Sequence, residues 1–256
     1  MNNPARIAFI GGGLVGISFL NEIKKLTARG IVEVVVGNVN GIIKETDNNV
    51  HDLLISMNSE ICDNPCEFLN YSLDSIFSVG NGYIFPADFI QIFGRQIINF
   101  HAAPLPAYRG SACPAFAILN NEREFGCSFH LVSDKIDEGN ILHVESFQIK
   151  NDDTAMDIDQ NAIKAGLQSI EKLGPDFFKG KYPARPQSFS RPPYQRKEID
   201  GARKVNLQWE QNKILRHVRA CDWPGVLKPA FVELEGGERL YLTAKLNISW
   251  IGKNPN

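Results

Sequence analysis

The chain has 256 residues, of which 43% are hydrophobic and 22% are charged, as expected of a globular protein with a substantial core. Its net charge is −2 and its pI about 6.2, so it lacks the basic balance of a typical nucleic-acid binder. The five cysteines are scattered and odd in number, which predicts neither a disulfide framework nor a metal site. The N-terminal residues contain no apolar stretch of signal-peptide or membrane-spanning length. We therefore expect a cytoplasmic protein with reduced thiols, no metal, and no membrane or nucleic-acid partner.

The first residues predict alternating strands and helices. Residues 6–10 (RIAFI) read as a buried strand, and the three glycines after them read as a turn. Residues 14–26 then place apolar side chains at helical spacing, and residues 32–36 (VEVVV) form a second β-branched strand. This order predicts an α/β fold, a Rossmann-like open and mostly parallel sheet flanked by helices.

Further elements follow at intervals that suit the same fold. The expected strands are residues 75–79, 96–100, 127–132 and 141–149, and the expected helices are residues 114–119 and 153–173. Gly174-Pro175 is expected to end the second helix. The catalytic part is therefore expected to span residues 1–182.

Residues 182–195 contain four prolines, a density that no long regular element tolerates. Residues 183–204 are thus expected to be a linker that passes over the surface. Residues 205–256 would form a small C-terminal region. It would hold a helix at 207–219 and a β-hairpin of residues 230–234 and 240–244 around Gly236-Gly237.

The glycine turn formally matches a dinucleotide fingerprint, Gly11-x-Gly13-x-x-Gly16. NAD binding also needs an acidic residue at the end of the second strand, and that strand ends Val36-Gly37-Asn38. The favoured interpretation is a turn that needs glycine for close packing. A cradle for a substrate phosphate, with Gly12 and Gly13, is the second interpretation. An NAD-dependent oxidoreductase remains the alternative outside acyl transfer.

The most informative motif is Asn99-x-His101, at the end of an expected strand. Residues two apart project from the same face of an extended chain, so an amide donor and an imidazole stand side by side. Together they could supply an oxyanion donor and a proton acceptor for acyl transfer. An orienting carboxylate is still required, and Asp134, Asp137, Glu138 and Asp153 compete for that role.

Four segments in order and spacing closely resemble the 10-formyltetrahydrofolate-dependent formyltransferase family. The family pattern is roughly N-x-H-x-S-L-L-P-x-Y-R-G, then G-x-T-x-H, then D-x-G-x-hydrophobic. The matching segments are Asn99-Phe100-His101, residues 104–110 (PLPAYRG), residues 126–130 (GCSFH) and residues 137–141 (DEGNI). A loose resemblance covers about residues 6–173. This chain has Ala103 where the family has serine and adds Pro104, which concerns the shape of the loop.

The resemblance implies a catalytic triad of Asn99, His101 and Asp137, of which Asp137 alone occupies D-x-G-x-I. It leaves open whether His101 or Asp137 finally takes the amine proton. It also implies that the formyl donor, 10-formyltetrahydrofolate, binds through the loop before the Asn-x-His strand and the segment before Asp137. Those cofactor-binding positions are Gly82, Tyr83, Ile84, Phe85, Ile90, Ser133, Asp134, Lys135 and Ile136. For substrate binding we expect Gly12, Gly13, Arg109 and Gly110.

The expected acceptor is the primary amine of a nucleotide-linked amino-deoxysugar that is formylated for a surface polysaccharide. His130 in the G-x-T-x-H position and the short C-terminal hairpin most resemble the sugar N-formyltransferases. Methionyl-tRNA formylation is the alternative, although the acidic pI and the short C-terminal region disfavour it. A formyltransferase that acts on another small amine is a further alternative. A homodimer through the C-terminal hairpin or nearby helices is expected, because a two-stranded ribbon is rarely stable alone.

Overall fold

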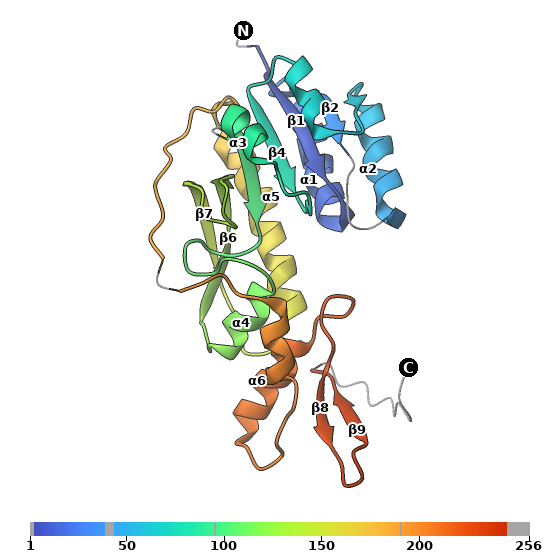
Figure 1. Ribbon diagram of the computed structural model, residues 1–256, viewed down its shortest axis with the longest axis vertical. Coiled ribbons are helices and arrows are strands. Elements are labelled where there is room, and N and C mark those ends of the chain that lie inside the picture. The colour runs from blue at the N-terminus through green and yellow to red at the C-terminus, as the bar shows by residue number, and fades with distance from the viewer. Residues whose placement is uncertain (1–2, 39–43, 95, 190, 245–256) are drawn as a thin grey trace.

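The structure is a computed structural model that describes residues 3–38, 44–94, 96–189 and 191–244 (Figure 1). A seven-stranded sheet has the strand order β3-β2-β1-β4-β5-β6-β7. The strands are β1 (Ala5–Gly11), β2 (Val32–Asn38), β3 (Glu60–Ile61), β4 (Ser75–Val79), β5 (Ile97–His101), β6 (Glu124–Leu131) and β7 (Ile141–Gln148). Pairing is parallel from β3 through β5 and antiparallel between β5, β6 and β7, which confirms the mostly parallel Rossmann-like sheet.

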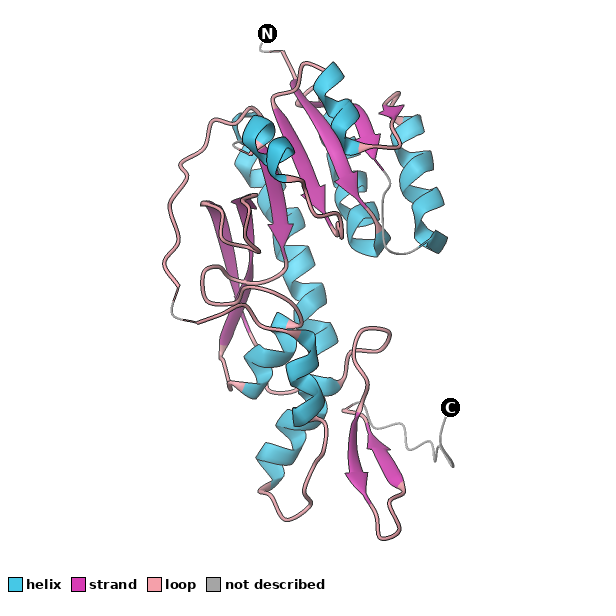
Figure 2. Ribbon diagram, in the orientation of Figure 1, coloured by secondary structure: helices cyan, strands magenta, loops and turns pink. Residues whose placement is uncertain are grey.

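Helices flank the sheet, as Figure 2 shows in cyan. The helices are α1 (Gly13–Ala28), α2 (Lys44–Ser56), α3 (Ala87–Phe93), α4 (Cys113–Leu119) and α5 (Ala155–Phe178), with 3-10 helices η1 (Pro65–Asn70) and η2 (Arg196–Ala202). A further helix, α6 (Gln211–Cys221), packs on α4 beyond the sheet. No helix in the described ranges is both long and apolar enough to cross a bilayer.

Alternating side chains divide the sheet into two buried faces. On β5, Ile98 and Phe100 join the core that contains residues of α1 and α5. Ile97 joins the opposite core, which includes Phe89 of α3. Because successive strand residues point to opposite faces, Asn99 shares the α3 face with Ile97. The pleat therefore aims Asn99 away from the larger core.

Two α-helices and one strand were not anticipated from the sequence, nor were the two 3-10 helices. Helix α2 is mostly polar, and among its described side chains only Val50 and Leu54 are fully buried, so its apolar periodicity is weak. Strand β3 has two residues and α3 only seven, which is too short for a clear period. Short elements of this kind depend on tertiary packing more than on local sequence.

The expected end of the long helix is confirmed in part. Gly174 has φ 67° and ψ −168°, which interrupts α5 where the sequence predicted a stop. Helical backbone nevertheless resumes at Pro175 and continues to Phe178. The reason is burial, because Phe177 and Phe178 are 3% and 0% exposed against the sheet core.

The segment after α5 passes along β7 toward α4 (Figure 1). Among its described residues, 183–189 and 191–194 form no helix or strand, and η2 follows them. Helix α6 begins four residues later than expected. The hairpin of β8 (Ala230–Glu233) and β9 (Arg239–Leu242) is present around Gly236-Gly237. Residues 245–256 of the expected C-terminal region lie outside the described residues.

Candidate active site

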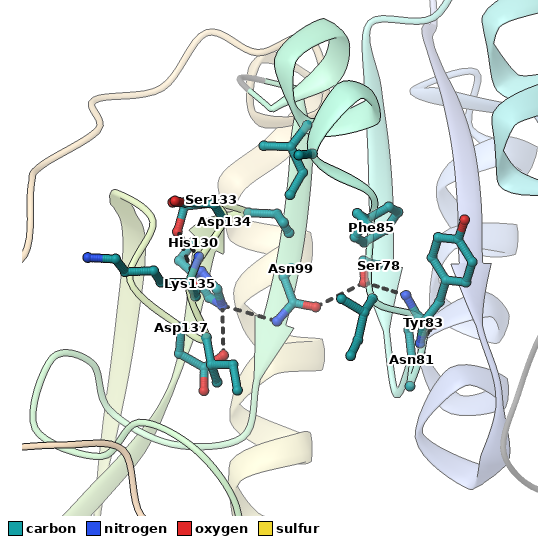
Figure 3. A pocket seen from close by; sticks show the side chains of 16 residues that line it. Ser78, Asn81, Tyr83, Phe85, Asn99, His130, Ser133, Asp134, Lys135 and Asp137 are labelled. Atoms are coloured by element: carbon teal, nitrogen blue, oxygen red, sulfur yellow. Dashed lines mark hydrogen bonds and ion pairs between the residues drawn. The ribbon is translucent and has the colours of Figure 1, made fainter.

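A row of three polar side chains crosses the sheet at the carboxyl ends of β4 and β5. The register pairs Ser78 with Asn99, and Asn99 with His130 on β6. All three therefore project from the α3 face. The Ser78 hydroxyl lies 2.9 Å from Asn99 Oδ1, and Asn99 Nδ2 lies 3.0 Å from His130 Nε2 (Figure 3). The carboxyl edge of a parallel sheet is where α/β proteins commonly bind ligands.

Asp137 approaches this row from the loop between β6 and β7. Its Oδ1 lies 3.6 Å from His130 Nε2, and its Oδ2 lies 3.8 Å from His101 Nδ1. The Gly110 N–H donates a 2.8 Å hydrogen bond to Oδ2. The glycine of D-x-G is required sterically, since a Cβ on Gly139 would lie 1.8 Å from the Leu131 carbonyl oxygen. The structure thus brings Asn99, His101 and Asp137 together.

His101, the last residue of β5, has one nitrogen occupied and the other directed toward Asp137. Its Nε2 lies 2.7 Å from the carbonyl oxygen of Tyr108. A carbonyl only accepts, so Nε2 carries the proton in the neutral ring. Nδ1 is then the basic nitrogen, and a proton that arrives there would face the Asp137 carboxylate. This arrangement can hold a proton taken from an amine.

His130 is a site residue for which the sequence motif implied no role. It is 3% exposed, and burial is the main cause that lowers its pKa to about 4, against an opposing effect of Asp137. The imidazole is therefore neutral at pH 7. Its Nδ1 lies 2.8 Å from the Leu131 carbonyl, which leaves Nε2 as an acceptor for the Asn99 amide. Its position in G-x-T-x-H was visible, but its pairing with Asn99 depends on strand register.

The competing carboxylates are placed elsewhere. Glu138 forms an ion pair with Arg109. Asp153 accepts a 2.8 Å hydrogen bond from the Lys150 N–H before α5. Asp134 lines the cleft described next but is not within ion-pair distance of His101. Of the four carboxylates, Asp137 is the one that contacts both histidines.

A cleft of about 320 Å³ opens beside the row and is lined by Asn99, His130 and Asp137. All nine positions expected to hold the formyl donor also line it: Gly82, Tyr83, Ile84, Phe85, Ile90, Ser133, Asp134, Lys135 and Ile136. Ile84 and Ile136 are 89% and 68% exposed, an unusual state for large apolar side chains. An extended aromatic ligand such as a folate would cover them, so the lining fits that group.

Two expected substrate-binding residues are engaged within the protein. Arg109 is 4% exposed, and its guanidinium contacts Glu138, the Arg191 carbonyl and the Phe189 ring. The Gly110 N–H is used by Asp137. These contacts hold the loop after β5 in place, and direct contact of Arg109 or Gly110 with substrate stays a prediction.

The glycine turn leads into α1 at the same edge of the sheet. A Cβ on Gly11 would lie 2.3 Å from the Val79 carbonyl oxygen of β4, which supports the close-packing interpretation. Gly12 is buried at the start of α1, and Gly13 has φ 62°. At the end of β2 the Asn38 amide is fully buried and donates to the Cys62 carbonyl. The last residue of β2 is thus an asparagine, where NAD binding would need a carboxylate for the ribose. Phosphate binding by Gly12 and Gly13 stays a prediction.

Residues 185–189 and 191–194, here called the strap, cross the two loops that carry Arg109 and Asp137. Gln187 Nε2 donates to the backbone carbonyls of Asp137, at 2.9 Å, and of Gly139. The Tyr194 ring stacks on Tyr108 at 5.3 Å. The sequence indicated only a surface linker here, because proline content reveals extended backbone but not what that backbone contacts.

The fold and this site define an α/β enzyme of acyl-group transfer. The chain belongs to the formyl transferase family, whose model matches residues 5–171. It is therefore an enzyme that transfers formyl groups.

Comparison with known proteins adds relatives of two kinds. A GDP-perosamine N-formyltransferase of Brucella melitensis is 27% identical over 179 residues, which cover 70% of this chain and 67% of that protein. A methionyl-tRNA formyltransferase of Borreliella afzelii is 37% identical over 113 residues, 43% of this chain and 35% of the relative.

Solved structures show the same fold over nearly the whole chain. A 4-N formyltransferase from Francisella tularensis has a TM-score of 0.76 at 16% identity and covers 94% of this chain and 98% of its own. An N-formyltransferase from Helicobacter canadensis, solved with folinic acid and dTDP-3-aminofucose, has a TM-score of 0.69 at 22% identity. It covers 84% of this chain and 80% of its own.

Proposed function

We propose that this enzyme transfers the formyl group of 10-formyltetrahydrofolate to the primary amine of a nucleotide-linked amino-deoxysugar. The observation that carries the proposal is the cleft in which Asn99 and Asp137 meet the nine expected donor-binding residues. The acceptor class is supported by the relatives, whose names include GDP-perosamine and dTDP-3-aminofucose. Methionyl-tRNA formyltransferases of Borreliella afzelii and Borrelia garinii match over 35% and 55% of their own lengths, less than the 67% of the GDP-perosamine enzyme, which disfavours that acceptor.

In the proposed reaction the neutral amine attacks the formyl carbon, and negative charge develops on the formyl oxygen. Asn99 Nδ2 would donate to that oxygen, since its second N–H is held only weakly, 3.3 Å from the Phe100 carbonyl. The proton lost by the amine would pass to His101 Nδ1 or to the adjacent Asp137 carboxylate. The bond between the formyl carbon and N10 of the donor would then break, and tetrahydrofolate would leave with that proton on N10. The strap and the Gly110 N–H would hold Asp137 in place while the charge moves.

The test is direct assay with purified protein and 10-formyltetrahydrofolate. GDP- and dTDP-linked sugars with the amine at C3 or C4 form the acceptor panel, and mass spectrometry detects one formyl group in place of one hydrogen. We expect one member of the panel to be formylated and the N99A variant to be at least about 100-fold slower. Formylation of charged initiator tRNA alone would overturn the acceptor, and a nicotinamide absorbance change would favour the oxidoreductase alternative.

The cellular setting belongs to the same proposal. We propose that the protein is cytoplasmic, acts as a homodimer, and supplies a formylated sugar to a surface polysaccharide. Five free cysteines, four of them buried, agree with a reducing compartment. Leu234 and Leu240 of the hairpin region are each 45% exposed, as a dimer surface there requires. Light scattering after size-exclusion chromatography tests the dimer, which L240K should weaken if the hairpin forms the interface.

A further inference from the structure

Asn99 can stabilise a developing oxyanion only with its Nδ2, and never its Oδ1, directed at the reacting atoms. An asparagine amide is nearly symmetric in shape, so packing alone does not select one of its two orientations. The selection must come from hydrogen bonds whose direction is fixed by groups that only donate or only accept. Such a set of bonds surrounds Asn99.

On the β4 side, the loop after this strand fixes the orientation of the Asn99 amide. The Tyr83 N–H, which only donates, lies 2.7 Å from Asn81 Oδ1. Asn81 must therefore present its Nδ2 to Ser78 Oγ, 3.4 Å away. With an N–H directed at its oxygen, the Ser78 hydroxyl has its own proton free for Asn99 Oδ1 at 2.9 Å.

On the β6 side, His130 fixes the orientation of the Asn99 amide independently. The Leu131 carbonyl accepts from His130 Nδ1, and burial keeps the His130 ring neutral by lowering its pKa. His130 Nε2 is then a lone-pair acceptor, which demands an N–H from Asn99 at 3.0 Å. Both ends thus require the same orientation of the Asn99 amide (Figure 3).

We propose that Ser78 is a positioning residue for formyl transfer, which orients the Asn99 amide through the chain Asn81–Ser78–Asn99–His130. Ser78 is 1% exposed and lies directly opposite Asn99 in the β4–β5 register. Ser78 lines the cleft, but its hydroxyl is engaged by Asn81 and Asn99 rather than left free for a ligand. The inference rests on the proposed function, because it assumes that Asn99 serves the reaction.

The test compares S78A, N99A, the double variant and a matched control, all in the full chain. We expect S78A to lower kcat about 10- to 100-fold, less than loss of the Asn99 donor itself, with KM for both substrates within about twofold. In the N99A background, S78A should change kcat by less than about twofold, because no amide remains to be oriented.

Ser75 provides the control, since it lies on the same strand, is fully buried and donates its hydroxyl to the Phe178 carbonyl away from the site. S75A should keep the wild-type kcat, and urea unfolding verifies that S78A is folded. A wild-type kcat for S78A, or an equal S78A effect in both backgrounds, would overturn the positioning role while leaving the proposed function intact. An N99A protein with full activity would instead overturn the proposed site itself.

Discussion

At the scale of single residues, the site separates into one histidine that can accept a proton and one that does not. His101 Nε2 is bound to the Tyr108 carbonyl, and its Nδ1 faces Asp137. His130 is almost fully buried, neutral at pH 7 and bound to Asn99. The two rings lie 6.3 Å apart, edge to face, on the two sides of one carboxylate. Their roles follow from burial and partners rather than from residue type.

We predict that H101A reduces kcat by about 100-fold or more, because a positioned proton acceptor contributes roughly that much. His101 is absent from the lining of the cleft, so binding of 5-formyltetrahydrofolate should be unchanged. Steady-state kinetics and calorimetry measure the two effects. H51A, at an exposed histidine of α2, is the control. Retention of more than half of the wild-type kcat by H101A would contradict the assignment.

We predict that His130 makes stability depend on pH in a defined window. Its folded-state pKa of about 4 lies below the unfolded value of 6.5, so the unfolded chain binds more protons between these limits. The contribution of the neutral His130 ring to the free energy of unfolding is complete above pH 6.5. This contribution, on the order of 3 kcal/mol, is lost as the pH falls toward 4. Urea unfolding at pH 7, 5.5 and 4.5 measures this loss. H130Q should lose less stability across the window, and equal losses would refute the argument.

At the scale of elements, the strap fixes the loop that carries Asp137. Asp137 has φ 55°, a conformation that a non-glycine residue keeps only when its surroundings hold it. Gln187 Nε2 donates to the carbonyls on both sides of this turn, while its Oε1 is buried without a hydrogen-bond partner among the described residues. The two hydrogen bonds that Nε2 donates to the turn therefore come at the cost of a buried oxygen without a partner.

We predict that Q187L lowers kcat about tenfold, because the Asp137 carboxylate would lose its defined position beside both histidines. Stability should fall by about 1–2 kcal/mol, because two part-buried carbonyls each lose a hydrogen bond worth about 1 kcal/mol. S188A, at an exposed neighbour on the strap, should match the wild type. Kinetics and urea unfolding give both quantities, and an unchanged kcat with lowered stability would show that Gln187 is structural only.

At the scale of the whole molecule, the C-terminal region and the catalytic part share one core. Phe116 of α4 and Val218 of α6 belong to a single buried cluster that also contains Ile199 of η2 and Val232 of β8. Helices α4 and α6 lie against each other at the base of the molecule (Figure 1). The two parts should therefore unfold together.

We predict coincident unfolding transitions from two probes that report on different parts. All three tryptophans, Trp209, Trp223 and Trp250, follow residue 204, so their fluorescence reports the C-terminal region. Circular dichroism reports mainly the helices of the catalytic part. I199A should destabilise the protein by about 2–5 kcal/mol and shift both transitions equally. Separate midpoints for the two probes would show independent domains.

The sequence predicted those elements of the fold whose residue pattern is local, and it missed those that depend on tertiary contacts. The strand at residues 75–79 and the strand that ends in Asn99-x-His101 were predicted to within one residue, because alternation and spacing are properties of the chain itself. Helix α3 and the contacts of the strap were missed because they depend on packing partners far away in sequence. The nine expected donor-binding positions came from family resemblance and converge on one cleft.

The order of a few side chains along the chain already indicates formyl transfer, because a motif can be read before the chain folds. Their arrangement in space depends on the fold. Strand register places Ser78, Asn99 and His130 in one row, and a one-residue slip would turn each side chain to the opposite face. Burial decides that His130 is neutral. Register and burial are properties of packed strands, so they exist only once the chain has folded.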